Sequence, residues 1–187
     1  LVHYGGELFI HSAGVDGYPA NLNYLDANTT LRILLPRPLL PGDKVTVALK
    51  WVLQYPSWVN DKSIYRLFGR SQEMVSLPLF YPTLAVFKQG AAIGSGKWWT
   101  EIGSERGDSA FTDASLFAVR ATLPGNQVPV TSGTLVVSHT VSPTQTQYVW
   151  VTGPSREFLL HTSPLFSSAS ETAYGTTVTS YWLPGDE

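Results

Sequence analysis

Four short apolar runs decide the fold: "SLFAVRATLP" (115–124), "SGTLVVSHTV" (132–141), "TQYVWVTGP" (146–154) and "REFLLHTS" (156–163). Each run is rich in β-branched and aromatic residues, which favour strands, and Pro, Gly, Asn or Ser separates it from the next. Turn signals that recur every 10 to 15 residues or so suit strands that follow one another in antiparallel order. The runs therefore predict an all-β protein built as an antiparallel β-sandwich.

The overall composition supports this class. The 187 residues include 13 Pro and 16 Gly, and 12% of them are aromatic. No long stretch keeps the apolar spacing of a helix, and the best helix-forming segment, "SIYRLFGRSQEM" (63–74), is interrupted by Gly69. The length suits a single domain over residues 1–187, and we expect little helix.

An earlier segment predicts a hairpin. The runs "TTLRILLP" (29–36) and "KVTVALKWVLQY" (44–55) flank "RPLLPGD" (37–43), whose Pro-Gly-Asp sequence is typical of a tight turn. The second run alternates with a period of two, which places one set of side chains against a core. That set consists of Val45, Val47, Leu49, Trp51 and Leu53.

Charge and the length of the apolar runs argue against two classes of partner, nucleic acid and membranes. Lys and Arg number 12 against 14 Asp and Glu, a net charge of −2, so the chain has no basic field for nucleic acid. No apolar run approaches the roughly 20 residues that span a bilayer, so no membrane segment is predicted. The absence of cysteine rules out disulfides and thiolate metal sites and leaves the cellular location unknown.

Catalytic motifs are missing. His3, His11, His139 and His161 lie far apart in the sequence, and the HExxH pattern of a zinc helix does not occur. No GxSxG motif positions a serine nucleophile, and "GSGK" lacks the spacing of a phosphate-binding loop. We therefore predict no catalytic residue, metal ligand or cofactor within this chain.

The tryptophans suggest a binding function, if they are exposed. Trp98 and Trp99 are consecutive, so in a strand they point to opposite faces. With Trp51 or Trp58 they could form an aromatic platform for a carbohydrate or a protein. The alternative is that both are buried, one in the core and one beneath a neighbouring domain.

Two adjacent charges, Arg156 and Glu157, open the last apolar run. In a strand they point to opposite faces, with Phe158 and Leu160 on the face of Arg156. We expect one charge to cap or pair within the sandwich and the other to reach a neighbouring strand or another domain. This assigns them a structural role and no catalytic one.

Several segments, in order, resemble one known arrangement. They are "LRILLPRPLLPGDKVTVALKW" (31–51), "LFYPTLAVF" (79–87), "WWTEIGSERGDSAFTDASLFAVRATLPGNQVPVTSGTLV" (98–136), "GPSREFLLHTS" (153–163) and "SYWLPGDE" (180–187). Together they resemble the N-terminal β-domain of the aminopeptidase N family of zinc metallopeptidases, over roughly residues 29–187.

This resemblance implies a non-catalytic domain that packs against the catalytic domain of the same chain. The family's GxMEN and HExxH motifs, and its zinc, belong to a module that would follow Glu187. The resemblance further implies that the first strands of the domain are missing, that residues 178–187 begin the link to the catalytic domain, and that the parent protein hydrolyses peptides.

The resemblance also suggests positions of interest. Gln72 and Glu73, in the stretch comparable to the one from which the family's domain lends a side chain to the substrate pocket, are candidates for that role; the alternative is that both are exposed loop residues. Tyr81 and Pro82 lie in the aromatic-proline segment that turns toward the catalytic module, and Arg156 and Glu157 enter the last strand. The alternative function is a free-standing β-sandwich binding module that uses Trp98 and Trp99.

Overall fold

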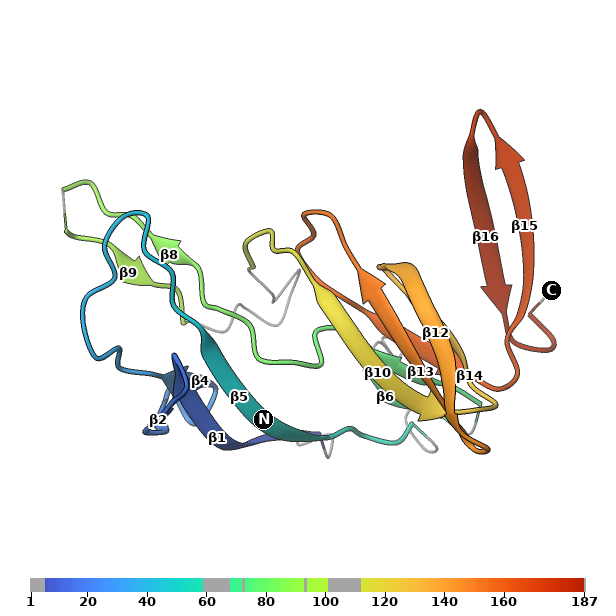
Figure 1. Ribbon diagram of the computed structural model, residues 1–187, viewed down its shortest axis with the longest axis horizontal. Coiled ribbons are helices and arrows are strands. Elements are labelled where there is room, and N and C mark those ends of the chain that lie inside the picture. Colours follow the sequence, from blue (N-terminus) through green and yellow to red (C-terminus); the bar gives the residue numbers. More distant parts are fainter. Residues whose placement is uncertain (1–5, 59–67, 72, 93, 101–111, 187) are drawn as a thin grey trace. The chain divides into compact units, whose positions relative to one another are not determined.

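The computed structural model describes residues 6–58, 68–71, 73–92, 94–100 and 112–186. Within these ranges the chain contains strands and turns but no helix, and the strands pair antiparallel (Figure 1). None of the described residues therefore belongs to a helix that could cross a membrane. The prediction of an all-β, antiparallel protein is confirmed, whereas the face-to-face packing of a sandwich stays a prediction.

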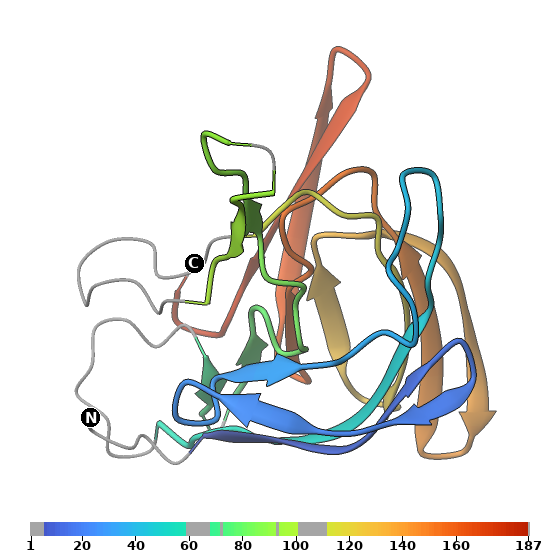
Figure 2. The ribbon, with the colours of Figure 1, turned by 90° about the vertical axis from the view of Figure 1, so that its left-hand side faces the viewer.

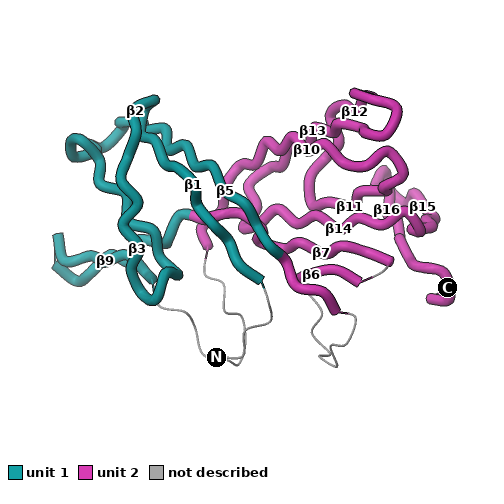
Figure 3. The backbone as a smooth tube through the Cα atoms, turned by 90° about the horizontal axis from the view of Figure 1, so that it is seen from below, with its two compact units in different colours: residues 1–54, 84–111 teal, residues 55–83, 112–187 magenta. Residues whose placement is uncertain are grey.

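The chain divides into two compact units (Figure 3), and the single domain over residues 1–187 stays a prediction. Unit 1 comprises residues 1–54 and 84–111, and unit 2 comprises residues 55–83 and 112–187. The physical reason is that each sheet pairs strands from one unit only.

The described residues of unit 1 form one three-stranded sheet and two small hairpins. The sheet has the order β2 (Tyr18–Ala20), β1 (Glu7–Val15), β5 (Val47–Gln54). β1 and β5 lie side by side along their length, from Glu7 opposite Gln54 to Val15 opposite Val47, with a register shift between Ile10 and Ser12 (Figure 2). The hairpins join β3 (Asn23–Leu25) to β4 (Thr30–Arg32) and β8 (Phe87–Lys88) to β9 (Lys97–Trp98).

The predicted hairpin between residues 29–36 and 44–55 is wrong, because β5 pairs with β1 and β4 pairs with β3. Asp26, Ala27 and Asn28 all have positive φ and form the turn that folds β4 back onto β3. The segment after β4 cannot continue a ladder, since three prolines there lack the N–H donor that pairing needs. They are Pro36, Pro38 and Pro41.

The predicted inner face of β5 is covered only in part. Leu49 and Leu53 are half-buried, whereas Val47 is 45% exposed and Trp51 is 36% exposed. The period of two is therefore correct for β5, but its apolar face does not lie wholly in a core.

In unit 2 the residues that the structure describes form two larger sheets and a separate hairpin. The first sheet has the order β10 (Ala118–Pro124), β13 (Gln145–Val151), β12 (Thr134–Ser142). The second has the order β11 (Val128–Thr131), β14 (Leu160–Ser163), β7 (Val75–Leu77), β6 (Gly69–Arg70). The hairpin joins β15 (Ser167–Ala173) to β16 (Thr176–Trp182), so residues 178–182, expected to begin an interdomain link, lie in a strand.

The core of unit 2 draws on both larger sheets. Trp150 of β13, Leu160 of β14 and Phe158, just before β14, are its buried centre. Gly133 is required beside it, because a Cβ atom there would lie 2.9 Å from the ring of Phe158. Half-buried hydrophobic residues surround the centre: Phe80, Tyr81, Phe117, Val119, Ala121, Leu123 and Tyr148.

Candidate functional site

Two segments singled out in the sequence meet at one hydrogen bond. The N–H of Phe158 donates to the hydroxyl of Tyr81 at 2.7 Å, although the residues are 77 positions apart. The ring of Tyr81 also packs edge-on against Phe80, at 5.2 Å between centroids, and against Phe117, at 5.6 Å. The aromatic-proline segment, with half-buried Pro82, is thus fixed to the stretch that precedes β14.

The pKa of the Tyr81 hydroxyl is raised, first because burial disfavours the phenolate and then because the Glu157 carboxylate repels it. The hydrogen bond from Phe158 acts in the opposite direction. The hydroxyl therefore stays neutral across the physiological range, and its role is to accept the bond from Phe158.

Arg156 and Glu157 both contribute backbone hydrogen-bond acceptors. They precede β14 instead of lying in it, which differs from the expected strand entry. The carbonyl of Arg156 accepts a hydrogen bond from the Thr112 hydroxyl at 3.0 Å, and that of Glu157 accepts one from the Ser155 hydroxyl at 2.7 Å. Neither side chain forms an ion pair with another described residue. The hydroxyls hold this segment in place.

Of the two candidates for the substrate pocket, the structure describes only Glu73, whose backbone is held in a turn by hydrogen bonds. Gln72 lies outside the described residues, whereas Glu73 lies in the turn between β6 and β7. The Ser71 hydroxyl accepts the N–H groups of Glu73 and Met74 at 3.0 Å each, and the fully buried Ser163 donates its hydroxyl to the Glu73 carbonyl. The backbone of Glu73 is therefore fixed while its carboxylate is exposed.

Of the tryptophans considered for an aromatic platform, Trp98 packs against an exposed aromatic residue that the sequence analysis missed. Trp98 is 52% exposed and packs edge-on against Phe87 of β8, which is 50% exposed, with ring centroids 5.2 Å apart. Gly96 lies against the Phe87 ring, and a Cβ atom there would clash with it. A signal for Phe87 was present in the sequence, since Phe87 and Trp98 flank the Gly-rich stretch 88–97, and the two residues face each other as a pair of β8 and β9.

The other tryptophans differ in environment. Trp99 is half-buried and lies under the Lys88 ammonium, 5.3 Å from the ring centroid. Trp58 is buried, and its indole N–H donates to the Phe68 carbonyl at 3.1 Å, so it cannot belong to a platform. Trp51 is exposed on β5. Trp98 is thus the tryptophan best placed for an external ligand.

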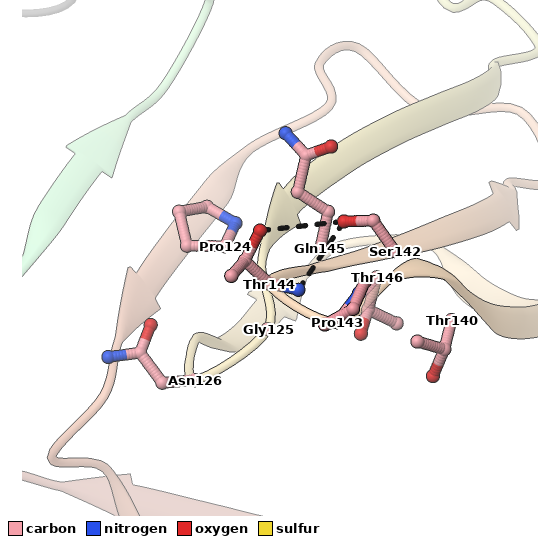
Figure 4. A pocket seen from close by; sticks show the side chains of 9 residues that line it. All are labelled: Pro124, Gly125, Asn126, Thr140, Ser142, Pro143, Thr144, Gln145 and Thr146. Atoms are coloured by element: carbon pink, nitrogen blue, oxygen red, sulfur yellow. Dashed lines mark hydrogen bonds between the residues drawn. The ribbon is translucent and has the colours of Figure 1, made fainter.

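An open hollow of about 470 Å³ lies between two turns of unit 2 (Figure 4). It is lined by residues 124–126 from the β10–β11 turn and by residues 140 and 142–146 around the β12–β13 turn. The Gly125 N–H donates to the Thr144 carbonyl at 2.8 Å, which joins the two turns. The lining offers hydroxyl and amide groups but no titratable side chain, so this hollow holds no acid, base or charged nucleophile.

No group of three or more His, Cys, Asp or Glu residues that could hold a metal ion occurs in the described part of the chain. Among the histidines, His161 lies on β14 between Val130 of β11 and Ser76 of β7. Its Nδ1 atom is buried and has no hydrogen-bond partner among the described residues, and burial lowers the pKa of its imidazole.

Comparison of the sequence with known protein families and with curated proteins finds no match.

Removal of the Tyr81 hydroxyl tests the link to Phe158. Tyr81→Phe leaves the Phe158 N–H without its acceptor in a buried position, so the free energy of unfolding should fall by about 1 to 3 kcal/mol. Urea titration followed by tryptophan fluorescence measures this. Tyr148→Phe is the matched control, because that ring stacks on Trp150 at 5.2 Å and should lose less than about 0.5 kcal/mol. Equal losses in the two variants would contradict the assigned role.

His161 should make stability depend on pH. Because the pKa of the imidazole is lower in the folded protein than in the unfolded chain, the unfolded chain binds more protons below about pH 6.5. The free energy of unfolding should therefore decrease as pH falls from 6.5, roughly the unfolded pKa, through the lower folded pKa. In urea titrations at several pH values His161→Leu should remove this part of the slope. His139→Leu, on an exposed position of β12, should retain it, and an unchanged slope in His161→Leu would refute the assignment.

Proposed function

We propose that this chain is the non-catalytic N-terminal β-domain of an aminopeptidase N-like zinc metallopeptidase. It packs against the catalytic domain and helps to shape the substrate pocket. The contact between Tyr81 and Phe158 carries the proposal, because it joins two of the segments on which the family resemblance rests. These segments are far apart in sequence, and the resemblance implies that they belong to one domain.

Exposed apolar side chains of unit 2 support a partner domain. Leu116 is 74% exposed, and on β12 three consecutive residues are exposed: Leu135 by 51%, Val136 by 59% and Val137 by 47%. Neighbouring apolar side chains that remain in water favour burial against another surface. A catalytic domain of the same polypeptide would supply that surface.

Glu73 supports a part in the substrate pocket. Its fixed backbone and exposed carboxylate suit an interaction with a cation, and the free α-amino group of a peptide substrate is such a cation. The described residues do not fit a zinc ion, so the proposal assigns the metal and the hydrolytic chemistry to the catalytic domain.

The extent of the gene tests this proposal. The reading frame should continue beyond Glu187 into a sequence with GxMEN and HExxH motifs, and a stop codon shortly after Glu187 would refute the assignment. The purified chain of residues 1–187 should hydrolyse no aminoacyl anilide, with or without added zinc. Measurable zinc-dependent hydrolysis would contradict the non-catalytic role.

A binding module is the second candidate, favoured by the exposed pair of Phe87 and Trp98. Two rings held edge to face by a short hairpin present an apolar surface on which a sugar ring can stack. This function requires no catalytic domain, which separates it from the first proposal.

Titration with polysaccharides tests the binding module. If it is correct, tryptophan fluorescence should shift on binding, and Trp98→Ala should abolish the shift. Trp51→Phe should preserve it, because this control also loses one tryptophan but leaves the Phe87–Trp98 pair intact. The absence of a shift with every polysaccharide would remove the support for this candidate.

A further inference from the structure

The β15–β16 hairpin of unit 2 pairs with no other strand in the described residues (Figure 1). Its two strands pair from Ser167 opposite Trp182 to Ala173 opposite Thr176, without a register shift. All of its positions are exposed except the half-buried Trp182. An isolated two-stranded hairpin is at best marginally stable in water, so a neighbouring strand would stabilise this one.

The turn fixes which backbone groups point outward. Tyr174 and Gly175 have φ values of 51° and 78°, as the two central residues of a type I′ turn require. The flanking pair, Ala173 and Thr176, is then hydrogen-bonded, and bonded and non-bonded pairs alternate along the hairpin. The non-bonded pairs direct their N–H and C=O groups away from the hairpin, and on β16 these groups belong to Thr177, Thr179 and Tyr181.

The outward edge of β16 lacks the charges, prolines and bulges that commonly prevent pairing between edges. Its sequence "TTVTSYW" contains no charge and no proline, and its register with β15 contains no bulge. Each of the other sheet edges in the described ranges carries a feature that disfavours pairing with another strand. Prolines lie on three of these edge strands (Pro19, Pro124 and Pro129), and charged residues lie on others (Arg32, Lys50, Arg70, Lys88, Lys97 and Glu171). Register shifts interrupt β1 and β12, and β3 is only three residues long.

We propose that β16 pairs antiparallel with β16 of a second copy of this chain, about a two-fold axis at Thr179. Thr179 then faces Thr179 of the second copy, and Thr177 faces Tyr181, so the outward N–H and C=O groups bond to one another. The strand is uncharged, and no like charges oppose each other in this arrangement. The contact is isologous and closes with two copies.

The charge on β15 explains why pairing selects β16. If β15 paired with itself around Ser170, the two copies of Glu171 would become diagonal neighbours on one face, which like charges disfavour. β15 therefore forms the guarded outer edge of the resulting four-stranded sheet.

Cross-linking tests the register directly, because the chain contains no cysteine. In the proposed dimer the two Thr179 residues form a hydrogen-bonded pair with Cα atoms about 5.5 Å apart, within the range that a disulfide spans. Residues 1–187 carrying Thr179→Cys should form a disulfide-linked dimer under mild oxidation by copper phenanthroline. Ser170→Cys, on the opposite edge of the hairpin, should not. No cross-link from Thr179→Cys, or equal cross-linking from both variants, would overturn the proposal.

Sedimentation of the unmodified chain provides a second test. The wild-type protein should form a dimer, and Thr179→Pro should weaken it by about tenfold or more because it removes an outward N–H from each copy. Ser170→Pro is the matched control, since it loses the same 2.8 Å hydroxyl contact with Thr179 but alters only the β15 edge, so its dimer should persist. A monomer at every concentration, or a dimer unaffected by Thr179→Pro, would refute the pairing.

Discussion

Unit 2 depends on the fixed position of Phe158. Its side chain is fully buried, and its N–H is bound by the Tyr81 hydroxyl. The ring meets Trp150 at 6.3 Å and Phe117 at 6.3 Å, so it joins the β13 sheet to the segment that leads into β14. The Tyr81 bond is needed because Phe158 precedes the strand, where no ladder partner accepts its N–H. One aromatic ring and one phenol hydroxyl thus connect elements that are distant in sequence.

Much of the strand content could be predicted because period-two patterns and turn residues are local signals. The four predicted runs correspond to strands β10, β12, β13 and β14, whereas β11 lies between the first two runs and was not predicted. The burial of Phe158 and Leu160 agrees with their predicted common face. Strand partners were harder to predict. The pairing of β4 with β3 depends on the positive φ of Asp26 to Asn28 in the turn between them, and an alternating pattern contains no information on such a conformation.

The candidate sites, like the strand partners, could be predicted only in part from the sequence. Residue type identified Trp98 as a potential surface aromatic, but Trp58 has the same type and lies buried with its indole N–H bonded. The environment of a tryptophan is set by tertiary packing, which a single sequence does not specify. The contact of Ser163 with the Glu73 carbonyl had no sequence signal at all, since serine is common throughout the chain and any hydroxyl can donate.

The hydroxyl groups that hold the loops have a wider consequence. Ser71, Ser155 and Ser163 fasten backbone segments that other small β proteins secure with disulfides or ion pairs. A neutral hydroxyl neither titrates near neutral pH nor attracts counterions. These hydrogen bonds are therefore insensitive to reducing agents and to ionic strength. The loops that they hold can keep the same geometry in oxidising and reducing surroundings and in dilute or concentrated salt.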